Sequence, residues 1–289
     1  MSIKSIVEFE YFTPNTVEEA VALLAKYGKD AKIIAGGTDL IPKMKAQVLT
    51  PKCIISLKRI EELKYLTFDE GRGLEFGAGV PIRRVENFEP VKKYFPALYE
   101  GAHNIASTQI RNAGTLVGNV CNAVPSADSA PGMLVLGAVL HLVSVRGKRN
   151  VPIHEFFTGV CKTVVEPDEL VTGITIPMQP ANSKSMYLPF TVRRALDLAM
   201  VGSAANVTVE DGVCADIRIA LGAVAVTPKR AYYAEEVLRG QKLTAALIER
   251  AAIVASEEDC APITDLRASK EYRKELVRVL TRDAIKACI

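Results

Sequence analysis

The chain has 289 residues, of which 49% are hydrophobic and 24% are charged, and its formal net charge is +3. This composition is typical of a soluble globular protein with two or three domains, and it excludes an intrinsically disordered chain. The net charge is small and no Lys/Arg-rich block stands out, so the sequence does not favour a nucleic-acid-binding protein.

The N-terminal segment, residues 1–16, lacks the apolar core of a signal peptide, so we expect none. The longest apolar run, residues 133–145, contains His141 and is too short to span a bilayer. We therefore expect a cytoplasmic protein without a membrane span.

The first 57 residues are predicted to form a small parallel sheet. A helix is expected to begin at Val17, with Asn15 or Thr16 as its N-cap, and to end at Gly28. The expected strands are residues 6–11, 32–35 and 53–57. Strands that alternate with a helix and a loop in so short a segment indicate parallel pairing.

The turn at residues 36–39 (GGTD) follows the second strand and is a candidate ligand site. Glycine lets backbone amides approach a phosphate closely, and Thr38 adds a hydroxyl. The motif is neither the G-x-G-x-x-G fingerprint nor a Walker A loop. A plain tight turn is the more common explanation for such a motif on its own.

The middle of the chain, residues 58–176, is predicted to alternate short strands and helices. A hairpin is expected around residues 69–73, and residues 170–177 read as the strand that closes this part. Residues 177–185 contain Pro and Ser and are predicted to be a linker.

A second candidate ligand site lies at residues 104–132. It combines a polar approach with a glycine turn at residues 114–119, in which Thr115 and Asn119 offer side-chain donors. Asp128 can accept hydrogen bonds from hydroxyls. The alternative is a polar turn followed by a helix that Ser126 or Asp128 caps.

The last part, residues 177–289, is predicted to be an α+β domain. Two apolar strands, residues 203–210 and 213–224, flank Asp211-Gly212, which is a strong hairpin signal. Helices are expected at residues 232–238, 244–255 and 269–287.

The six cysteines form no C-x-x-C pair, and the three histidines lack metal-ligand spacing. We expect the cysteines to be reduced and buried as small apolar residues. A metal site and a Cys/His catalytic pair therefore have little support.

Two glycine motifs and an acidic residue, taken together in this order, carry a family resemblance. They are residues 35–40 (AGGTDL), residues 110–119 (IRNAGTLVGN) and residues 128–131 (DSAP). Over essentially its whole length the chain resembles the FAD-binding medium subunit of molybdenum hydroxylases. That family includes carbon monoxide dehydrogenase, nicotinate dehydrogenase and the flavin domain of xanthine dehydrogenase.

The resemblance implies an α+β protein with the vanillyl-alcohol-oxidase-type (PCMH-type) FAD-binding fold. The FAD-binding domain would comprise residues 1–176, built of two α/β subdomains at residues 1–57 and 58–176. A C-terminal domain of antiparallel strands and helices, residues 177–289, would follow.

The resemblance also implies a cleft that holds FAD in extended form between the two N-terminal subdomains. The amides of Gly36, Gly37 and Thr38 would contact the pyrophosphate, and Asp128 would accept from ribityl hydroxyls. No residue is implied to be catalytic or to bind a metal. The cofactor-binding residues implied in this way are Ile33, Ile34, Ala35, Gly36, Gly37, Thr38, Asp39, Leu40, Ile105, Ala106, Thr115, Leu116, Val117, Gly118, Asn119, Asp128, Val165 and Leu198.

The function implied is that of one subunit of an oxidoreductase, with non-covalent FAD. Electrons would come from a 2Fe–2S cluster on a small subunit, after starting at a molybdopterin cofactor on a large subunit, and would leave to NAD(P)⁺ or another acceptor. A dimer of such heterotrimers is expected. The alternatives are a free-standing flavin oxidoreductase that acts directly on an organic substrate, and a non-catalytic binding protein that retains the fold.

The chain departs from the family pattern at two positions. Val117 stands where the family often has glycine, and because a β-branched residue resists positive φ, we expect an ordinary backbone there. Pro189 stands where relatives often have lysine, which puts the identity of the electron acceptor in question.

Overall fold

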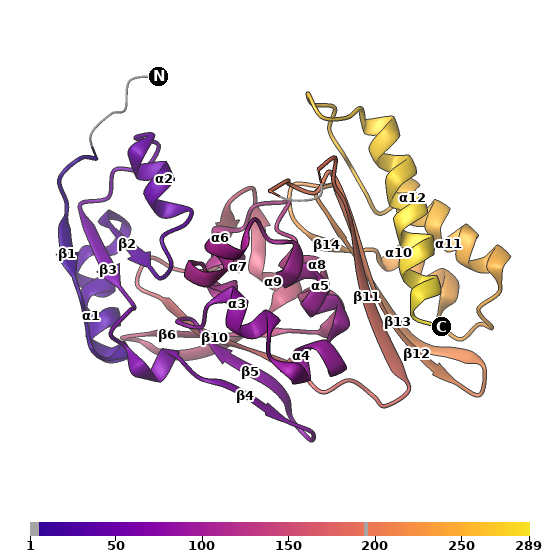
Figure 1. The fold of residues 1–289 in the computed structure, drawn as a ribbon, viewed down its shortest axis with the longest axis horizontal. Coiled ribbons are helices and arrows are strands. Elements are labelled where there is room, and N and C mark those ends of the chain that lie inside the picture. The colour runs from indigo at the N-terminus through magenta and orange to yellow at the C-terminus, as the bar shows by residue number, and fades with distance from the viewer. Residues whose placement is uncertain (1–5, 194–195) are drawn as a thin grey trace.

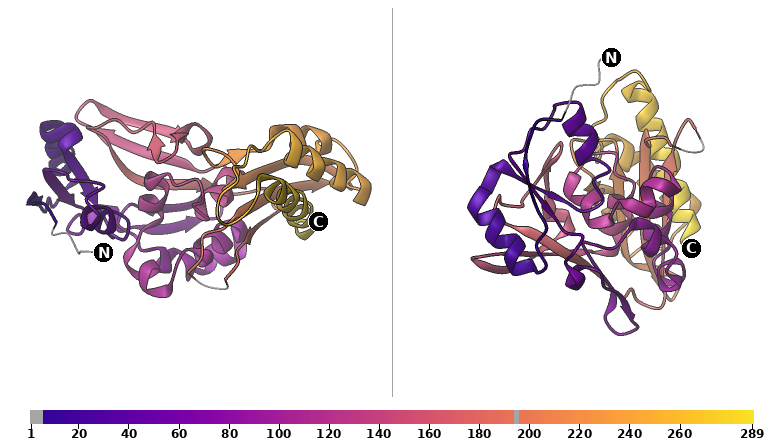
Figure 2. Two further views of the ribbon diagram at one scale, coloured as in Figure 1. Left: turned by 90° about the horizontal axis from the view of Figure 1, so that it is seen from above. Right: turned by 60° about the vertical axis from the view of Figure 1, so that its left-hand side comes forward.

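The structure is a computed structural model, and it describes residues 6–193 and 196–289. In these described residues, three larger sheets follow one another along the chain, each with its own helices (Figure 1), and two short strands, Phe157–Gly159 and Lys162–Thr163, form a fourth, two-stranded sheet. The first sheet and the helices of the C-terminal part lie at opposite ends of the long axis (Figure 2). Within the described ranges, no helix is both long enough and apolar enough to cross a membrane.

The N-terminal part of the chain contains the predicted parallel sheet, with strand order β1-β3-β2. The Thr16 side chain caps the first helix by accepting from the amide of Glu19, and Gly28 ends that helix with a φ of +51°. The first strand is shorter and begins later than the predicted residues 6–11. The elements are β1 (Glu10–Phe12), α1 (Val17–Tyr27), η1 (Gly28–Asp30), β2 (Ala31–Ile34), α2 (Leu40–Lys45) and β3 (Cys53–Ser56).

The middle part contains a five-stranded antiparallel sheet with order β4-β5-β10-β6-β7. The predicted hairpin is present as β4 and β5, and the strand at residues 170–177 lies in the centre of the sheet. The strands are β4 (Leu66–Asp69), β5 (Gly73–Gly77), β6 (Val139–Ser144), β7 (Gly147–Pro152) and β10 (Leu170–Pro177), and η2 (Glu61–Leu63) leads into them.

Short helices fill most of the segment between β5 and β6. All eight residues of the last of them, α8, are buried, and the long apolar run at residues 133–145 consists of the second half of this helix, a short turn and the strand β6. These helices are α3 (Ile82–Glu86), α4 (Glu89–Tyr94), α5 (Pro96–Asn104), α6 (Thr108–Ala113), α7 (Leu116–Asn122) and α8 (Ser129–Leu136). After β7 come α9 (Ile153–Phe156), β8 (Phe157–Gly159) and β9 (Lys162–Thr163).

The described C-terminal part contains a four-stranded antiparallel sheet and three helices. The α+β character, the hairpin of two strands and the three helices were predicted, whereas the first and the last strand of the sheet were not. The hairpin turn at Asp211 and Gly212 has φ angles of +48° and +77°. The strands are β11 (Ser183–Phe190), β12 (Val201–Glu210), β13 (Val213–Gly222) and β14 (Lys229–Arg230), and the helices are α10 (Tyr232–Leu238), α11 (Ala245–Glu257) and α12 (Lys270–Ala287).

The predicted linker at residues 177–185 is partly wrong, because β11 begins at Ser183 and pairs with β12 from that residue onward. The strand begins with polar residues, so the sequence alone does not show the alternation of buried and less buried side chains that the sheet imposes on it. Pro189 is tolerated because β11 lies at the edge of the sheet.

The C-terminal sheet is buried on both faces. Tyr187, Ala204 and Ala220 belong to the main core with the middle part of the chain. Residues of the opposite parity, such as Met186 and Ala205, pack in a second core with the C-terminal helices. The sheet therefore lies between α5 and α8 on one side and α10–α12 on the other (Figure 1).

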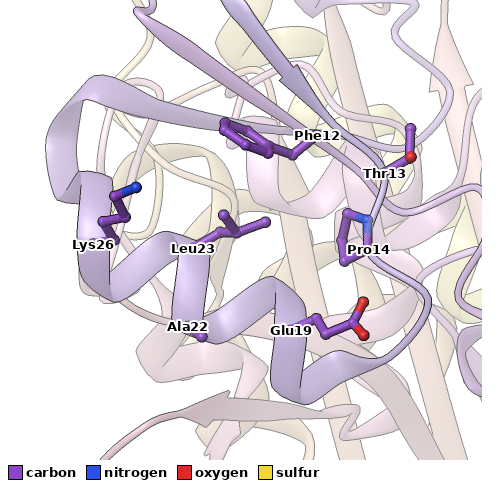
Figure 3. Close-up of a pocket in the computed structure, with 7 residues that line it drawn as sticks. All are labelled: Phe12, Thr13, Pro14, Glu19, Ala22, Leu23 and Lys26. Atoms are coloured by element: carbon purple, nitrogen blue, oxygen red, sulfur yellow. The ribbon is translucent and has the colours of Figure 1, made fainter.

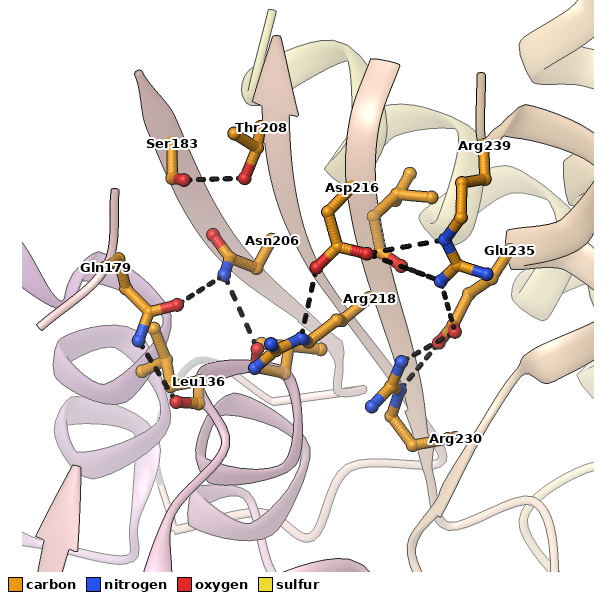
Figure 4. Close-up of polar contacts among 12 residues, drawn as sticks. Leu136, Gln179, Ser183, Asn206, Thr208, Asp216, Arg218, Arg230, Glu235 and Arg239 are labelled. Atoms are coloured by element: carbon orange, nitrogen blue, oxygen red, sulfur yellow. Dashed lines mark hydrogen bonds and ion pairs between the residues drawn. The ribbon is translucent and has the colours of Figure 1, made fainter. Parts of the chain in front are cut away.

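Polar contacts fix the sheet to both layers (Figure 4). On the side of α8, Asn206 donates to Gln179, which in turn donates to the carbonyl of Leu136. On the side of α10, Glu235 is 1% exposed and forms an ion pair of 2.6 Å with Arg230. Glu235 also accepts from the amide of Ile219 in β13, so the helix and the strand are held together.

Arg273 of α12 is an almost fully buried cation that joins three segments. It is 2% exposed and donates to the carbonyl of Met200 and to the carboxylate of Asp265 over 2.6 and 2.8 Å. A third, longer bond of 3.5 Å reaches the carbonyl of Ala223. The guanidinium therefore connects the start of β12, the end of β13 and the loop before α12.

Arg273→Met should destabilise the protein by roughly 2–4 kcal/mol, because it removes the donor to the carbonyl of Met200 and the buried cationic partner of Asp265. Chemical denaturation measures this loss. Lys274→Met is the matched control on the same helix, since its ion pair with Glu257 is partly exposed and should contribute less than about 1 kcal/mol. Equal losses in the two variants would contradict a structural role for Arg273.

Candidate functional site

The first glycine turn follows β2 directly, as predicted. Residues 35–39 connect the strand to α2, and Gly37 has a φ of +72°, a conformation that favours glycine. Within the described part of the chain, the amides of Gly36, Gly37 and Thr38 have no hydrogen-bond acceptor. Three free amides on one turn are a suitable donor set for a phosphate group.

The structure brings the two glycine motifs into contact. A Cβ atom at position 36 would collide with the carbonyl oxygen of Ala113 and lie 2.6 Å from the Cα of Gly114. A Cβ atom at position 114 would in turn lie 3.1 Å from the Oγ1 of Thr38. The absence of side chains at both glycines allows this backbone approach between the N-terminal part and the middle part of the chain.

The predicted glycine turn at residues 114–119 is mostly helical, which corrects the sequence-based expectation. Thr115 is the N-cap of α7 and accepts from the amide of Gly118 over 3.0 Å. Val117 is a buried helical residue with ordinary backbone angles, as its β-branched side chain predicted. The Thr115 side chain thus orders the first turn of α7, and its hydroxyl hydrogen remains available for donation.

The segment before this helix is fixed by a buried ion pair. Arg111 of α6 donates to Glu86 of α3 over 3.0 Å and to the carbonyl of Ile105 over 2.9 Å. Burial alone would raise the pKa of Glu86, but hydrogen bonds from His103 and Arg83, together with the charge of Arg111, hold it below its usual value. The ion pair fixes Ile105 at the end of α5, next to Ala106 with its φ of +46°.

Asn119 and Asp128 lie in adjacent elements. The hydroxyl of Ser129 donates to the Oδ1 of Asn119 over 2.7 Å, which leaves the amide Nδ2 without a partner in the described part of the chain. Close packing of α5 and α8 sets the position of Asp128, since a Cβ atom at Gly101 would lie 2.6 Å from its carbonyl oxygen.

Asp128 is 6% exposed and precedes α8, but its side chain makes no capping hydrogen bond. This finding argues against the alternative that Asp128 serves as a helix cap. Its Oδ1 instead accepts from the hydroxyl of Tyr187 over 2.7 Å. Burial raises the pKa of Asp128 to about 6, although the bond from Tyr187 opposes the rise.

Sequence reasoning missed Tyr187. It lies 59 residues from Asp128, on a strand whose first three residues were predicted to belong to a linker. No local signal in the sequence points to this contact.

Val165 and Leu198 lie on separate loops. Val165 follows β9 and is partly buried against the main core, whereas Leu198 is 55% exposed. Neither has a described hydrogen bond to the two glycine motifs. Arg194 and Ala195, which shortly precede Leu198 in the chain, lie outside the described residues.

A surface hollow of about 460 Å³ lies away from these motifs (Figure 3). It is formed by α1 and the segment after β1, and Phe12, Pro14 and Leu23 give it an apolar lining. None of the predicted site residues lines it.

The cysteines are all unpaired, and four of them are buried, as expected for small apolar residues. Cys161 is exposed and contradicts that expectation. In the described ranges, no three His, Cys, Asp or Glu side chains gather as a possible metal site.

Comparison with known proteins places this arrangement in a family. Residues 7–179 match the model of the FAD binding domain in molybdopterin dehydrogenase. Residues 188–288 match that of the CO dehydrogenase flavoprotein C-terminal domain.

Two relatives are similar along almost their whole length. The xanthine dehydrogenase FAD-binding subunit of Escherichia coli O157:H7 is 34% identical over 96% of this chain and 95% of its own length. The carbon monoxide dehydrogenase medium chain of Afipia carboxidovorans is also 34% identical, over the same shares of the two chains.

Two solved structures share the fold. Carbon monoxide dehydrogenase from Hydrogenophaga pseudoflava, in a form that lacks the Mo-pyranopterin moiety, has a TM-score of 0.93 at 33% identity, over 98% of both chains. Quinoline 2-oxidoreductase from Pseudomonas putida 86 has a TM-score of 0.90 at 30% identity, with the same coverage. These matches confirm the predicted fold class. The chain therefore belongs to the family of FAD-binding medium subunits of molybdenum-dependent dehydrogenases, and it carries their FAD-binding domain followed by their C-terminal domain.

Proposed function

We propose that this chain is the electron-transfer subunit of a molybdenum hydroxylase and binds FAD between its glycine motifs. It takes electrons from a 2Fe–2S subunit and passes them on to an acceptor such as NAD(P)⁺. The single observation that carries the proposal is the contact between the turn at Gly36 and the turn at Ala113 and Gly114. This contact brings three free amides close to the capped start of α7. A dinucleotide needs such donors for its phosphates, and the arrangement provides them on two neighbouring segments.

The residues divide by the part of FAD that they would hold. Gly36, Gly37 and Thr38 offer amides to the pyrophosphate, and Asn119 offers its free Nδ2. Asp128 offers the Oδ2 that Tyr187 leaves unbonded. The remaining residues proposed to contact the cofactor, without assignment to a particular part of it, are Ile33, Ile34, Ala35, Asp39, Leu40, Ile105, Ala106, Thr115, Leu116, Val117, Gly118, Val165 and Leu198.

Bound FAD supplies the ability to exchange electrons singly with a cluster and in pairs with an acceptor. The role of the chain's own residues is to bind and orient the cofactor and to keep water away from it. No side chain is required to act as a general acid or base.

The proposed partners are a 2Fe–2S small subunit and a molybdopterin large subunit, in a dimer of heterotrimers located in the cytoplasm. The names of the relatives support this assembly, since they are medium chains or FAD subunits of xanthine and carbon monoxide dehydrogenases. We propose residues 1–176 as the FAD-binding domain and residues 177–289 as the C-terminal domain.

Two other functions are separable by simple observations. A free-standing flavin oxidoreductase is disfavoured, because this chain covers 95% of a relative that is itself a single subunit. A non-catalytic binding protein would be colourless, whereas the proposed subunit would be purified yellow, with a flavin absorption spectrum.

Gly36→Ala should lower FAD affinity by roughly tenfold or more, because its Cβ atom would force the two glycine motifs apart. The ratio of flavin to protein after purification measures the effect. Gly71→Ala is the control, since that glycine lies in an exposed turn where the nearest atom, 3.3 Å away, belongs to the side chain of Asp69. A Gly36→Ala protein with full flavin content would argue against this cofactor site.

Asp128→Ala should weaken FAD binding by about 5- to 150-fold, through the loss of an acceptor that contributes about 1–3 kcal/mol. The FAD-free variant should lose no more than about 1–3 kcal/mol of stability, because Asp128 makes no capping bond and the loss is limited to the acceptor of the buried Tyr187 hydroxyl. Titration with FAD and a melting curve on the same preparation test both statements. A lower melting temperature with unchanged FAD affinity would instead indicate a purely structural role.

The isolated subunit should show no substrate-dependent reduction of its flavin, and addition of the 2Fe–2S and molybdopterin subunits should restore it. Anaerobic stopped-flow absorbance at the flavin band measures the rate. Rapid reduction of the isolated chain by one organic substrate would support the free-standing flavoenzyme.

A further inference from the structure

Tyr187 is a buried phenol of the C-terminal sheet that contacts the proposed cofactor site. It is 1% exposed, and its hydroxyl lies 2.7 Å from the Oδ1 of Asp128, which precedes α8. The hydrogen bond thus crosses from the C-terminal part of the chain to the FAD-binding part.

The position of the phenol is set by its surroundings. A Cβ atom at Gly202 in the neighbouring strand β12 would collide with the hydroxyl and lie 2.8 Å from the ring atom Cε2. The missing side chain at Gly202 therefore leaves the space that the Tyr187 ring occupies. Tyr187 also packs in the main core and not with the C-terminal helices.

The direction of this hydrogen bond follows from the charges. Burial raises the pKa of Tyr187 well above its usual value, and the neighbouring Asp128 raises it further, so the phenol stays protonated and donates. In the described part of the chain, Tyr187 is the one ionisable side chain that shifts the pKa of Asp128. Gly101 of α5 lies against the backbone of Asp128, and the next residue, Ser129 of α8, bonds to Asn119 of α7; all three of these neighbours are uncharged.

The two oxygens of the Asp128 carboxylate have different surroundings. Oδ1 is bonded to Tyr187, whereas Oδ2 has no hydrogen-bond partner in the described part of the chain. Oδ2 is also not among the fully buried unpaired side-chain atoms, which are Asn206 Oδ1 and Arg273 Nε. One oxygen is thus fixed by the protein, and the other is open to a ligand.

We propose that Tyr187 is a positioning residue for the cofactor site: its hydroxyl fixes one oxygen of Asp128, so that the other is held ready for the hydroxyls of FAD. This inference rests on the proposed function. The C-terminal sheet thereby contributes to FAD binding through Asp128, without contacting the cofactor through Tyr187.

The test is the FAD dissociation constant of the full chain between pH 5 and pH 9, measured by fluorescence titration of the FAD-free protein. In the unmodified chain, affinity should fall as the pH drops through about 6, where Asp128 becomes protonated. Tyr187→Phe should weaken binding at pH 7.5 roughly 5- to 30-fold. Because the lost hydrogen bond lowers the pKa of Asp128, its removal should also move the fall in affinity to higher pH.

Two further variants complete the design. Tyr65→Phe removes a half-buried phenol hydroxyl that has no described bond to Asp128, and it should leave both the affinity and the pH profile unchanged. Asp128→Asn should abolish the acid-side fall. The double variant Tyr187→Phe/Asp128→Asn should bind FAD no more weakly than Asp128→Asn alone, since Tyr187 acts through Asp128.

The outcomes separate the two proposals. If the unmodified chain does not bind FAD, the proposed function fails. If Asp128→Asn weakens binding but Tyr187→Phe keeps the original affinity and pH profile, only the role of Tyr187 fails. A Tyr187→Phe variant that is less stable to heat, with no shift in its pH profile, would show a merely structural tyrosine and would overturn the inference.

Discussion

The packing of the C-terminal sheet against the middle part of the chain depends on the complete burial of one short helix, α8. Helix α8 has no solvent-facing side, because it contacts α5 in the middle part of the chain and packs against the C-terminal sheet. Gly132 makes this packing possible, since a Cβ atom there would lie 2.8 Å from the carbonyl carbon of Ala97 in α5. An apolar helix without an exposed face must be enclosed by other elements, and here the C-terminal sheet encloses the helix that follows Asp128.

Buried carboxylates show how this protein uses charge in its interior. Glu86 and Glu235 each have arginine partners, and these ion pairs hold helices in place. Asp128 is different, because its protein partner is a neutral phenol and burial raises its pKa. A carboxylate without a cationic partner is costly to bury, and groups of this kind are concentrated at functional sites.

Local signals in the sequence predicted local structure well. Thr16 and Gly28 mark the ends of the first helix, and Asp211-Gly212 marks the hairpin, because capping and turn chemistry act over a few residues. The glycine motif at residues 114–119 was expected to be a turn, yet Thr115 starts a helix there. Two glycines close together indicate that the backbone can form a turn. They do not show whether a capping residue such as Thr115 will start a helix there instead.

The site could be predicted only in part. The two glycine motifs were identified, but their contact depends on how the N-terminal part and the middle part of the chain meet, which no short motif encodes. The bond from Tyr187 to Asp128 depends on a strand whose polar start resembles a linker. Burial of its alternate residues arises from the helices that cover the sheet, so the pattern is visible only in the folded chain.

The edge position of β11 has a consequence for the chain before it meets any partner. An open sheet edge invites pairing with a strand of another molecule, and such pairing leads to aggregation. Pro189 has no amide hydrogen to offer to an incoming strand, and the exposed Lys184 places a positive charge on the same strand. Both features disfavour pairing of this edge with a strand of another molecule, so the chain should resist aggregation through β11 before it binds its partners. Pro189 therefore limits strand pairing at this edge as well as fitting into it.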